Sequence, residues 1–68
     1  MTKFTTNQRA YAGQFSVMDS DSRRLIHGGG VTTHRPRLYL TAESAIEAAA
    51  SMRPESYGAT RLEAVELV

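Results

Sequence analysis

The side chains most able to do chemistry are basic ones gathered in one stretch of the chain. The segment from residue 23 to residue 37 contains no acid, and it holds Arg23, Arg24, His27, His34, Arg35 and Arg37. Guanidinium groups bind phosphates and carboxylates through paired hydrogen bonds. We therefore predict a partner-binding surface made of Arg23, Arg24, His27, Arg35, Arg37 and the nearby Tyr39.

Two kinds of anionic partner fit this stretch, and a third interpretation needs no partner. Arginines contact the phosphates of nucleic acids, and arginine and tyrosine are common anchors in protein interfaces. The charges could also belong to a solvated loop that keeps the protein soluble. The first 40 residues hold six basic and two acidic residues, whereas the last 28 hold two basic and five acidic ones. This asymmetry and the few aromatic residues for base stacking favour a protein partner, with nucleic acid as the alternative.

No catalytic or metal-binding motif is complete. The segment His27–Gly30 matches the His-Gly-Gly-Gly pattern of esterase oxyanion holes, but the Gly-x-Ser-x-Gly nucleophile motif is absent. The glycines lack the lysine of a phosphate-binding P-loop. His27 and His34, even with Asp19 or Asp21, do not have a recognised metal-ligand spacing. We therefore expect no enzyme activity, no catalytic residue, no metal and no cofactor.

The length and composition indicate one small domain. A chain of 68 residues has room for a single domain, residues 1–68. It contains no cysteine, which excludes disulfides and thiolate zinc sites. No apolar run follows Lys3 as in a signal peptide, and none is long enough to cross a membrane. We expect a cytoplasmic protein without a membrane partner.

The first half of the chain has the pattern of strands. Residues 2–8 are polar and expected to be frayed, or at best the start of a strand. Apolar and polar residues alternate over 10–18, which predicts a half-buried strand. The short polar side chains of 19–22 predict a turn, and 23–27 the returning strand of a hairpin.

The second half contains the clearest element, a helix over 42–52. Thr41 is a good N-cap, alanines are frequent, and Pro54 ends the segment. A third strand is expected over 31–40, at an edge or with a bulge because Pro36 cannot donate to a ladder. Residues 60–68 alternate with a change of phase that a bulge would correct, so we favour a strand over a short helix.

Together these elements predict an α+β fold. The expected order is β-β-β-α-β, a small antiparallel sheet with one helix packed on one face. The helix should bury Ala42, Ala45, Ile46, Ala49 and Ala50. The expected core is Phe15, Val17, Leu25, Ile26, Leu38, Leu40, Ile46, Leu62, Val65 and Leu67.

The layout resembles that of small anti-CRISPR inhibitors from phages and mobile elements. The resemblance lies in the hairpin Tyr11–Ile26, the glycine break Gly28–Gly30 and the strand-helix-strand unit Leu38–Val68. It implies stoichiometric docking on a larger ribonucleoprotein effector, which would block guide–target pairing or nuclease recruitment. Two alternatives remain open: a nucleic-acid-binding module, and a homodimer or larger homo-oligomer paired through the Pro36 edge and the apolar C-terminus Val65–Val68.

Overall fold

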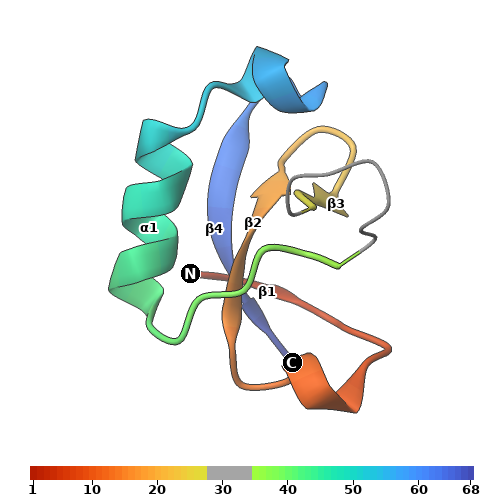
Figure 1. The fold of residues 1–68 in the computed structure, drawn as a ribbon. Helices are drawn as coiled ribbons and strands as arrows, with labels where there is room; N and C mark the ends of the chain where they lie inside the picture. The colour runs from red at the N-terminus through yellow and green to blue at the C-terminus, as the bar shows by residue number, and fades with distance from the viewer. Residues whose placement is uncertain (28–34) are drawn as a thin grey trace.

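The computed structural model describes residues 1–27 and 35–68 (Figure 1). Within these residues, three strands precede one α-helix, and one strand follows it. The elements in chain order are β1 (Thr2–Phe4), the 3-10 helix η1 (Arg9–Tyr11), β2 (Phe15–Asp19), β3 (Arg24–Leu25), α1 (Ala42–Ser51), the 3-10 helix η2 (Pro54–Tyr57) and β4 (Leu62–Leu67). No helix in this part of the chain has the length and apolar character needed to span a bilayer.

The strands form one sheet in the order β1-β4-β2-β3. The two central strands, β2 and β4, are antiparallel, as are β2 and β3. The short strand β1 instead runs parallel to β4, with Thr2 opposite Val65 and Phe4 opposite Leu67. The prediction of a small α+β domain with one helix is confirmed, and the sheet is mixed rather than wholly antiparallel because of β1.

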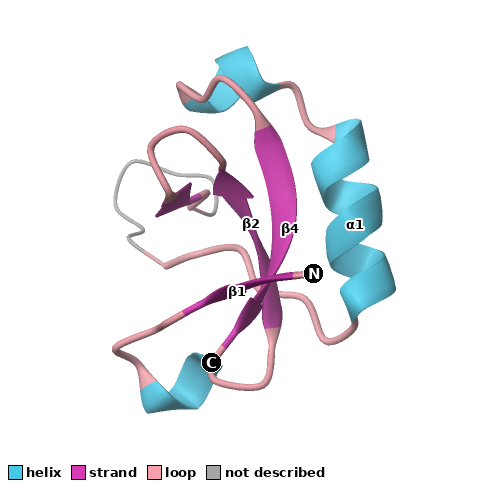
Figure 2. Ribbon diagram, turned by 180° about the vertical axis from the view of Figure 1, so that it is seen from behind, coloured by secondary structure: helices cyan, strands magenta, loops and turns pink. Residues whose placement is uncertain are grey.

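The helix follows the local signals closely. The hydroxyl oxygen of Thr41 accepts the Ser44 backbone N–H at 3.2 Å, which satisfies one of the free donors at the helix start. The helix ends at Ser51 with Met52 as its C-cap, before Pro54. Figure 2 shows α1 lying along one side of the sheet.

The buried face of α1 differs from the expected one. Ala45 is fully buried, whereas Ile46 is 53% exposed and Ala50, also expected on the buried face, is exposed. Consecutive helical residues are about 100° apart around the axis, so Ile46 falls outside a stripe centred on Ala45. Leu40, just before the helix, is 84% exposed. The assignment of Leu40 and Ile46 to the core was therefore wrong.

The main apolar cluster centres on the fully buried Met18, Val65 and Leu67. The half-buried Phe4, Tyr11, Leu25 and Leu38 pack against it. Strand β4 pairs with β2 in an unbroken register from Leu62 to Glu66, so no bulge is present there. The phase change in its sequence arises because the strand carries apolar residues on both faces, as central strands do.

The C-terminal strand is not free to pair with a second copy of the chain. β4 lies between β1 and β2 in the sheet. Beyond β4, the Val68 N–H donates to the Phe4 carbonyl and the Thr6 N–H donates to the Val68 carbonyl, both at 2.9 Å. The alternative of a dimer paired through Val65–Val68 therefore has no free strand edge to use in that segment.

Three other expected segments differ from the structure. Residues 2–4 form β1 rather than a frayed end, and the strand expected over 10–18 begins only at Phe15, after η1. Of the strand expected over 31–40, residues 31–34 lie outside the described residues, as do Gly28–Gly30. Within 35–40 the structure has isolated bridges, Pro36 to His27 and Tyr39 to Phe15.

Candidate functional site: a basic groove beside the β2–β3 hairpin

The site is built around the carboxylate of Asp19 at the end of β2. Its Oδ1 atom accepts backbone N–H groups from Asp21 at 3.3 Å, Thr60 at 3.3 Å and Arg61 at 3.2 Å. Its Oδ2 atom accepts the Ser22 hydroxyl at 2.9 Å. One side chain thus ties the hairpin turn to the segment that leads into β4, two parts of the chain that are far apart in sequence.

The hydrogen bonds determine the charge of Asp19, which is 6% exposed. Burial raises the pKa of this carboxyl, but the hydrogen bonds from the Ser22 hydroxyl and the three backbone N–H groups outweigh it, so the pKa is lowered from 3.8 to about 2. Asp19 is therefore ionised at neutral pH. Its oxygens are already occupied by donors of the protein, so it stabilises the turn rather than acting on a ligand.

Arg23 closes the hairpin turn in an unusual backbone conformation. Its φ is +59°, in the left-handed region, and its N–H donates to the Asp19 carbonyl at 2.8 Å. Left-handed backbone costs a residue with a Cβ about 1–2 kcal/mol. An arginine is therefore held in a conformation that glycine would adopt at lower cost.

A groove of about 630 Å³ opens beside this turn. Its lining residues include the exposed Arg23, Arg24 and His27, together with Tyr57 of η2 and Phe4 of β1. A second hollow of about 370 Å³ adjoins it and shares Phe4, Leu25 and His27. We call these two hollows together the basic groove. It combines positive charge with apolar and aromatic surface.

The predicted binding residues are only partly brought together. Arg23, Arg24 and His27 line the basic groove, as expected for a common site. Arg37 lies apart from them: its guanidinium carbon is 5.5 Å from the centre of the Tyr57 ring, and Nη2 donates to the Tyr57 hydroxyl at 3.4 Å. The Nε atom of Arg37 is buried and has no hydrogen-bond partner among the described residues.

The remaining two predicted residues have different positions. Arg35 is exposed and does not line the basic groove. Tyr39 is half-buried, and its backbone exchanges hydrogen bonds with Phe15, 2.8 Å for the tyrosine N–H and 2.9 Å for the phenylalanine N–H. Tyr39 therefore pairs with the first residue of β2 and does not line the groove.

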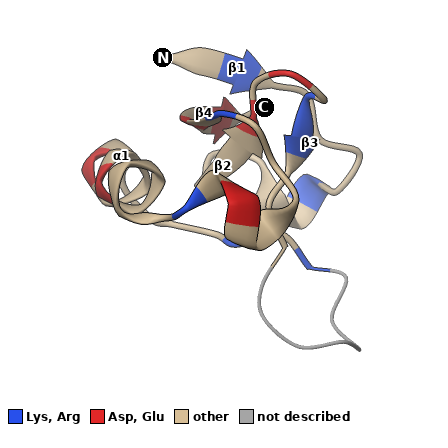
Figure 3. Cartoon of the chain, turned by 90° about the horizontal axis from the view of Figure 1, so that it is seen from above, with Lys and Arg blue, Asp and Glu red and all other residues tan. Residues whose placement is uncertain are grey.

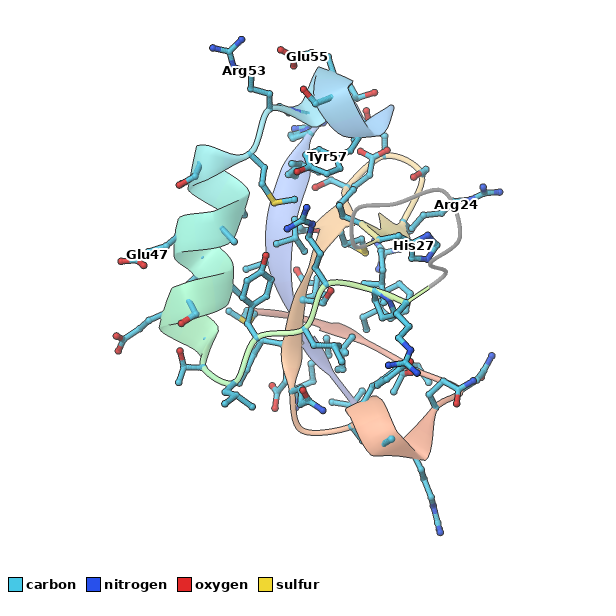
Figure 4. The ribbon with its side chains drawn as sticks, viewed as in Figure 1. Arg24, His27, Glu47, Arg53, Glu55 and Tyr57 are labelled. Carbon is cyan, nitrogen blue, oxygen red and sulfur yellow. The ribbon has the colours of Figure 1, made fainter. Side chains whose placement is uncertain are left out.

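The acidic face of α1 and the basic groove lie on different sides of the molecule. Figure 4 shows Arg24 and His27 on the side opposite Glu47, which projects from α1. Figure 3 shows acidic positions on α1 and basic positions on β1 and β3, with further acidic positions on β2 and β4. Among the described residues one ion pair forms, between Arg61 and Asp21 at 3.4 Å, and both side chains are largely exposed. Arg23 and Arg24 thus have no carboxylate partner within that part of the chain.

The chemistry available in the basic groove is recognition of an anion. Within residues 1–27 and 35–68, no group of three or more acidic or histidine side chains is placed to hold a metal ion. Arg24 offers a freely accessible guanidinium, and His27 adds a nitrogen donor beside it. Tyr57 and Phe4 add contact area of the kind that anchors protein interfaces.

Sequence reasoning missed Phe4, Tyr57 and Asp19 as parts of this site. Phe4 belongs to a segment expected to fray, and Tyr57 to a loop. Both reach the groove only through tertiary packing. For Asp19 a partial signal existed, because the polar run 19–22 already predicted a turn in which an aspartate bonds to its own backbone.

The unusual conformation of Arg23 leads to a stability prediction. The variant Arg23→Gly is expected to be more stable than the natural protein by about 1 kcal/mol, since glycine adopts positive φ without steric cost. Urea unfolding followed by circular dichroism measures the change. The matched control is Arg24→Gly, which removes the same side chain from β3 and should lose about 1 kcal/mol because glycine weakens a strand. Equal changes in the free energy of unfolding in both variants would contradict the assignment of a costly left-handed conformation to Arg23.

Comparison with known proteins adds no family to this description. No protein-family model matches the sequence, and no curated protein and no solved structure matches it either.

Proposed function

We propose that this protein is a non-enzymatic binding protein that docks on an acidic surface of a larger protein or ribonucleoprotein complex. The observation that carries the proposal is the basic groove. Its wall holds Arg23, Arg24 and His27, whereas the carboxylate that also lines it, Asp19, is occupied by hydrogen bonds within the protein. An anionic partner would supply the counter-charge that Arg23 and Arg24 lack among the described residues.

The character of the groove favours a protein partner over bare nucleic acid. A nucleic-acid site depends mainly on many phosphate contacts along an extended basic surface. Here the charges are few and lie next to Phe4, Leu25 and Tyr57, which offer apolar contact. The acidic residues of α1 also give the molecule a face that would repel a phosphate backbone.

In its more specific form, the proposal is that the protein is a phage or mobile-element inhibitor of a CRISPR-type effector. Its support is the resemblance of the small sheet with one helix to anti-CRISPR inhibitors. In this form the basic groove binds an acidic protein surface or the RNA of the effector, and the bound inhibitor blocks nucleic-acid targeting.

The test compares two double variants with equal changes in net charge. Arg23→Glu with Arg24→Glu reverses the charge of the groove wall. Arg9→Glu with Arg53→Glu reverses two exposed arginines that do not line the basic groove. Tagged proteins are used to capture partners from a bacterial lysate, with and without nuclease, and captured proteins are quantified by mass spectrometry. Affinity for the captured complex is then measured by interferometry.

We expect the groove variant to bind more than about tenfold more weakly, because it replaces attraction by repulsion at the interface. The control variant should bind like the natural protein, and both should keep their circular dichroism spectra. A ribonucleoprotein that survives nuclease as the captured partner supports the inhibitor form. Equal binding by both variants contradicts the proposal, and recovery of nucleic acid alone, lost on nuclease treatment, makes the groove a phosphate-binding site instead.

A further inference from the structure

The two outer strands of the sheet both border the basic groove. β1 and β3 stand at opposite ends of the strand order, yet Phe4 of β1 and Leu25 of β3 pack against the same cluster of Met18, Val65 and Leu67. Both residues also line both hollows of the groove. The sheet must therefore curl on this face, which leaves the groove as the gap between its two edges. In Figure 3 the end of β1 and the strand β3 lie on the side away from α1.

The backbone at the β3 edge has groups that face this gap. The Arg23 N–H donates to the Asp19 carbonyl, and the Ile26 N–H donates to the Val17 carbonyl at 2.9 Å, so Ile26 directs its N–H toward β2. Successive residues of a strand point their backbone groups to alternate sides. The N–H and C=O of Leu25 therefore point away from β2, toward the gap.

The side chains of β3 alternate in a way that selects a ligand. Leu25 faces the apolar cluster, and Arg24, its neighbour, faces the other side and is exposed. A strand added beside β3 would place alternate side chains next to these two residues. Apolar side chains would meet Leu25 and Phe4, and acidic side chains would meet Arg24.

We propose that the partner inserts an extended segment, alternating in acidic and apolar residues, as an additional strand along β3. The segment exchanges main-chain hydrogen bonds with Leu25, its acidic side chains pair with Arg24, and its apolar side chains fill the gap against Leu25 and Phe4. This is binding by strand addition, in which the main chain supplies affinity and alternate side chains supply specificity. It rests on the proposed function, because it specifies the partner that the basic groove receives.

The test uses synthetic peptides of about eight residues, a usual strand length. The probe alternates glutamate and valine. One control alternates lysine and valine, and a second has the glutamate–valine sequence with alternate backbone amides methylated, which removes donors but keeps every side chain. Affinities come from fluorescence anisotropy, and hydrogen exchange of the Leu25 amide is followed by NMR.

We expect the glutamate–valine peptide to bind at least about tenfold more tightly than either control, since each loses either the charge pairing or the ladder hydrogen bonds. The Leu25 amide should exchange more slowly when that peptide is bound. Equal binding of the methylated and unmethylated peptides, both weakened by Arg23→Glu with Arg24→Glu, overturns strand addition and leaves the proposed function standing. No preference for glutamate over lysine overturns the inference, and capture from lysate unaffected by the arginine reversal overturns the proposed function itself.

Discussion

The variant Met18→Ala is expected to be largely unfolded at room temperature. Met18 is fully buried in the cluster with Val65 and Leu67, on the central strand β2. Truncating a buried methionine to alanine costs about 2–5 kcal/mol through lost contacts and the cavity left behind. A domain of this size rarely has more than about 3–5 kcal/mol of stability in total. The loss thus approaches the total folding stability of the domain. Thermal unfolding followed by circular dichroism should therefore show no cooperative transition.

Two matched variants separate this effect from a general sensitivity to substitution. Met18→Leu keeps the volume and should cost less than about 1.5 kcal/mol. Ile46→Ala removes a large apolar side chain that is 53% exposed, and should change stability by less than about 0.5 kcal/mol. A cooperative transition in Met18→Ala at an unchanged temperature, or a large loss in Ile46→Ala, would show that the core lies elsewhere.

The contrast between Met18 and Ile46 also explains which parts of the fold were predictable. The helix boundaries depend on local chemistry: the cap at Thr41, the alanine run and the stop at Pro54. Strand β4 was predictable from alternation within its own sequence. The side of the helix that packs depends instead on where the sheet lies, which no local pattern contains. Ile46 was placed in the core for its size, although the sheet packs against Ala45.

Strand β1 was missed for a similar reason. Thr2–Phe4 has only three residues, and its neighbours are polar, so no periodicity marks it. It is a strand because β4 offers it a parallel partner at the other end of the chain. Non-local pairing of this kind overrides weak local preference, which is why strands are less predictable than helices from single sequences.

The candidate site was predictable in its charge but not in its shape. Of the residues in the acid-free stretch, Arg23, Arg24 and His27 line one hollow, and their role in binding stays a prediction. The stretch could not predict that the Arg37 guanidinium lies over the Tyr57 ring, or that the Tyr39 backbone forms hydrogen bonds with Phe15. The first outcome depends on a contact with Tyr57, and the second on pairing with Phe15 of β2, both far from these residues in sequence. The groove itself exists because Asp19 ties the hairpin to the segment before β4.

The hydrogen bonds accepted by the Asp19 carboxylate are expected to make folding stability fall as the solution is acidified below about pH 4. The pKa of Asp19 is about 2 in the folded protein against 3.8 ordinarily, so the unfolded chain takes up this proton at a higher pH than the folded one. The contribution of Asp19 is therefore complete above the ordinary pKa and is lost as the pH falls toward 2. Urea unfolding between pH 2 and pH 6, fitted for the free energy of unfolding, measures this slope.

The variant Asp19→Asn isolates the contribution of this carboxylate from those of the other acids. An asparagine oxygen can still accept the three backbone N–H groups that reach Oδ1, and its amide can donate to the Ser22 hydroxyl, so the turn keeps its hydrogen bonds. The variant should be less stable than the natural protein at pH 6, because charge-assisted hydrogen bonds are the stronger ones. The difference should shrink as the pH falls to 2. A difference that stays constant across this range would show that Asp19 does not hold the turn through its charge.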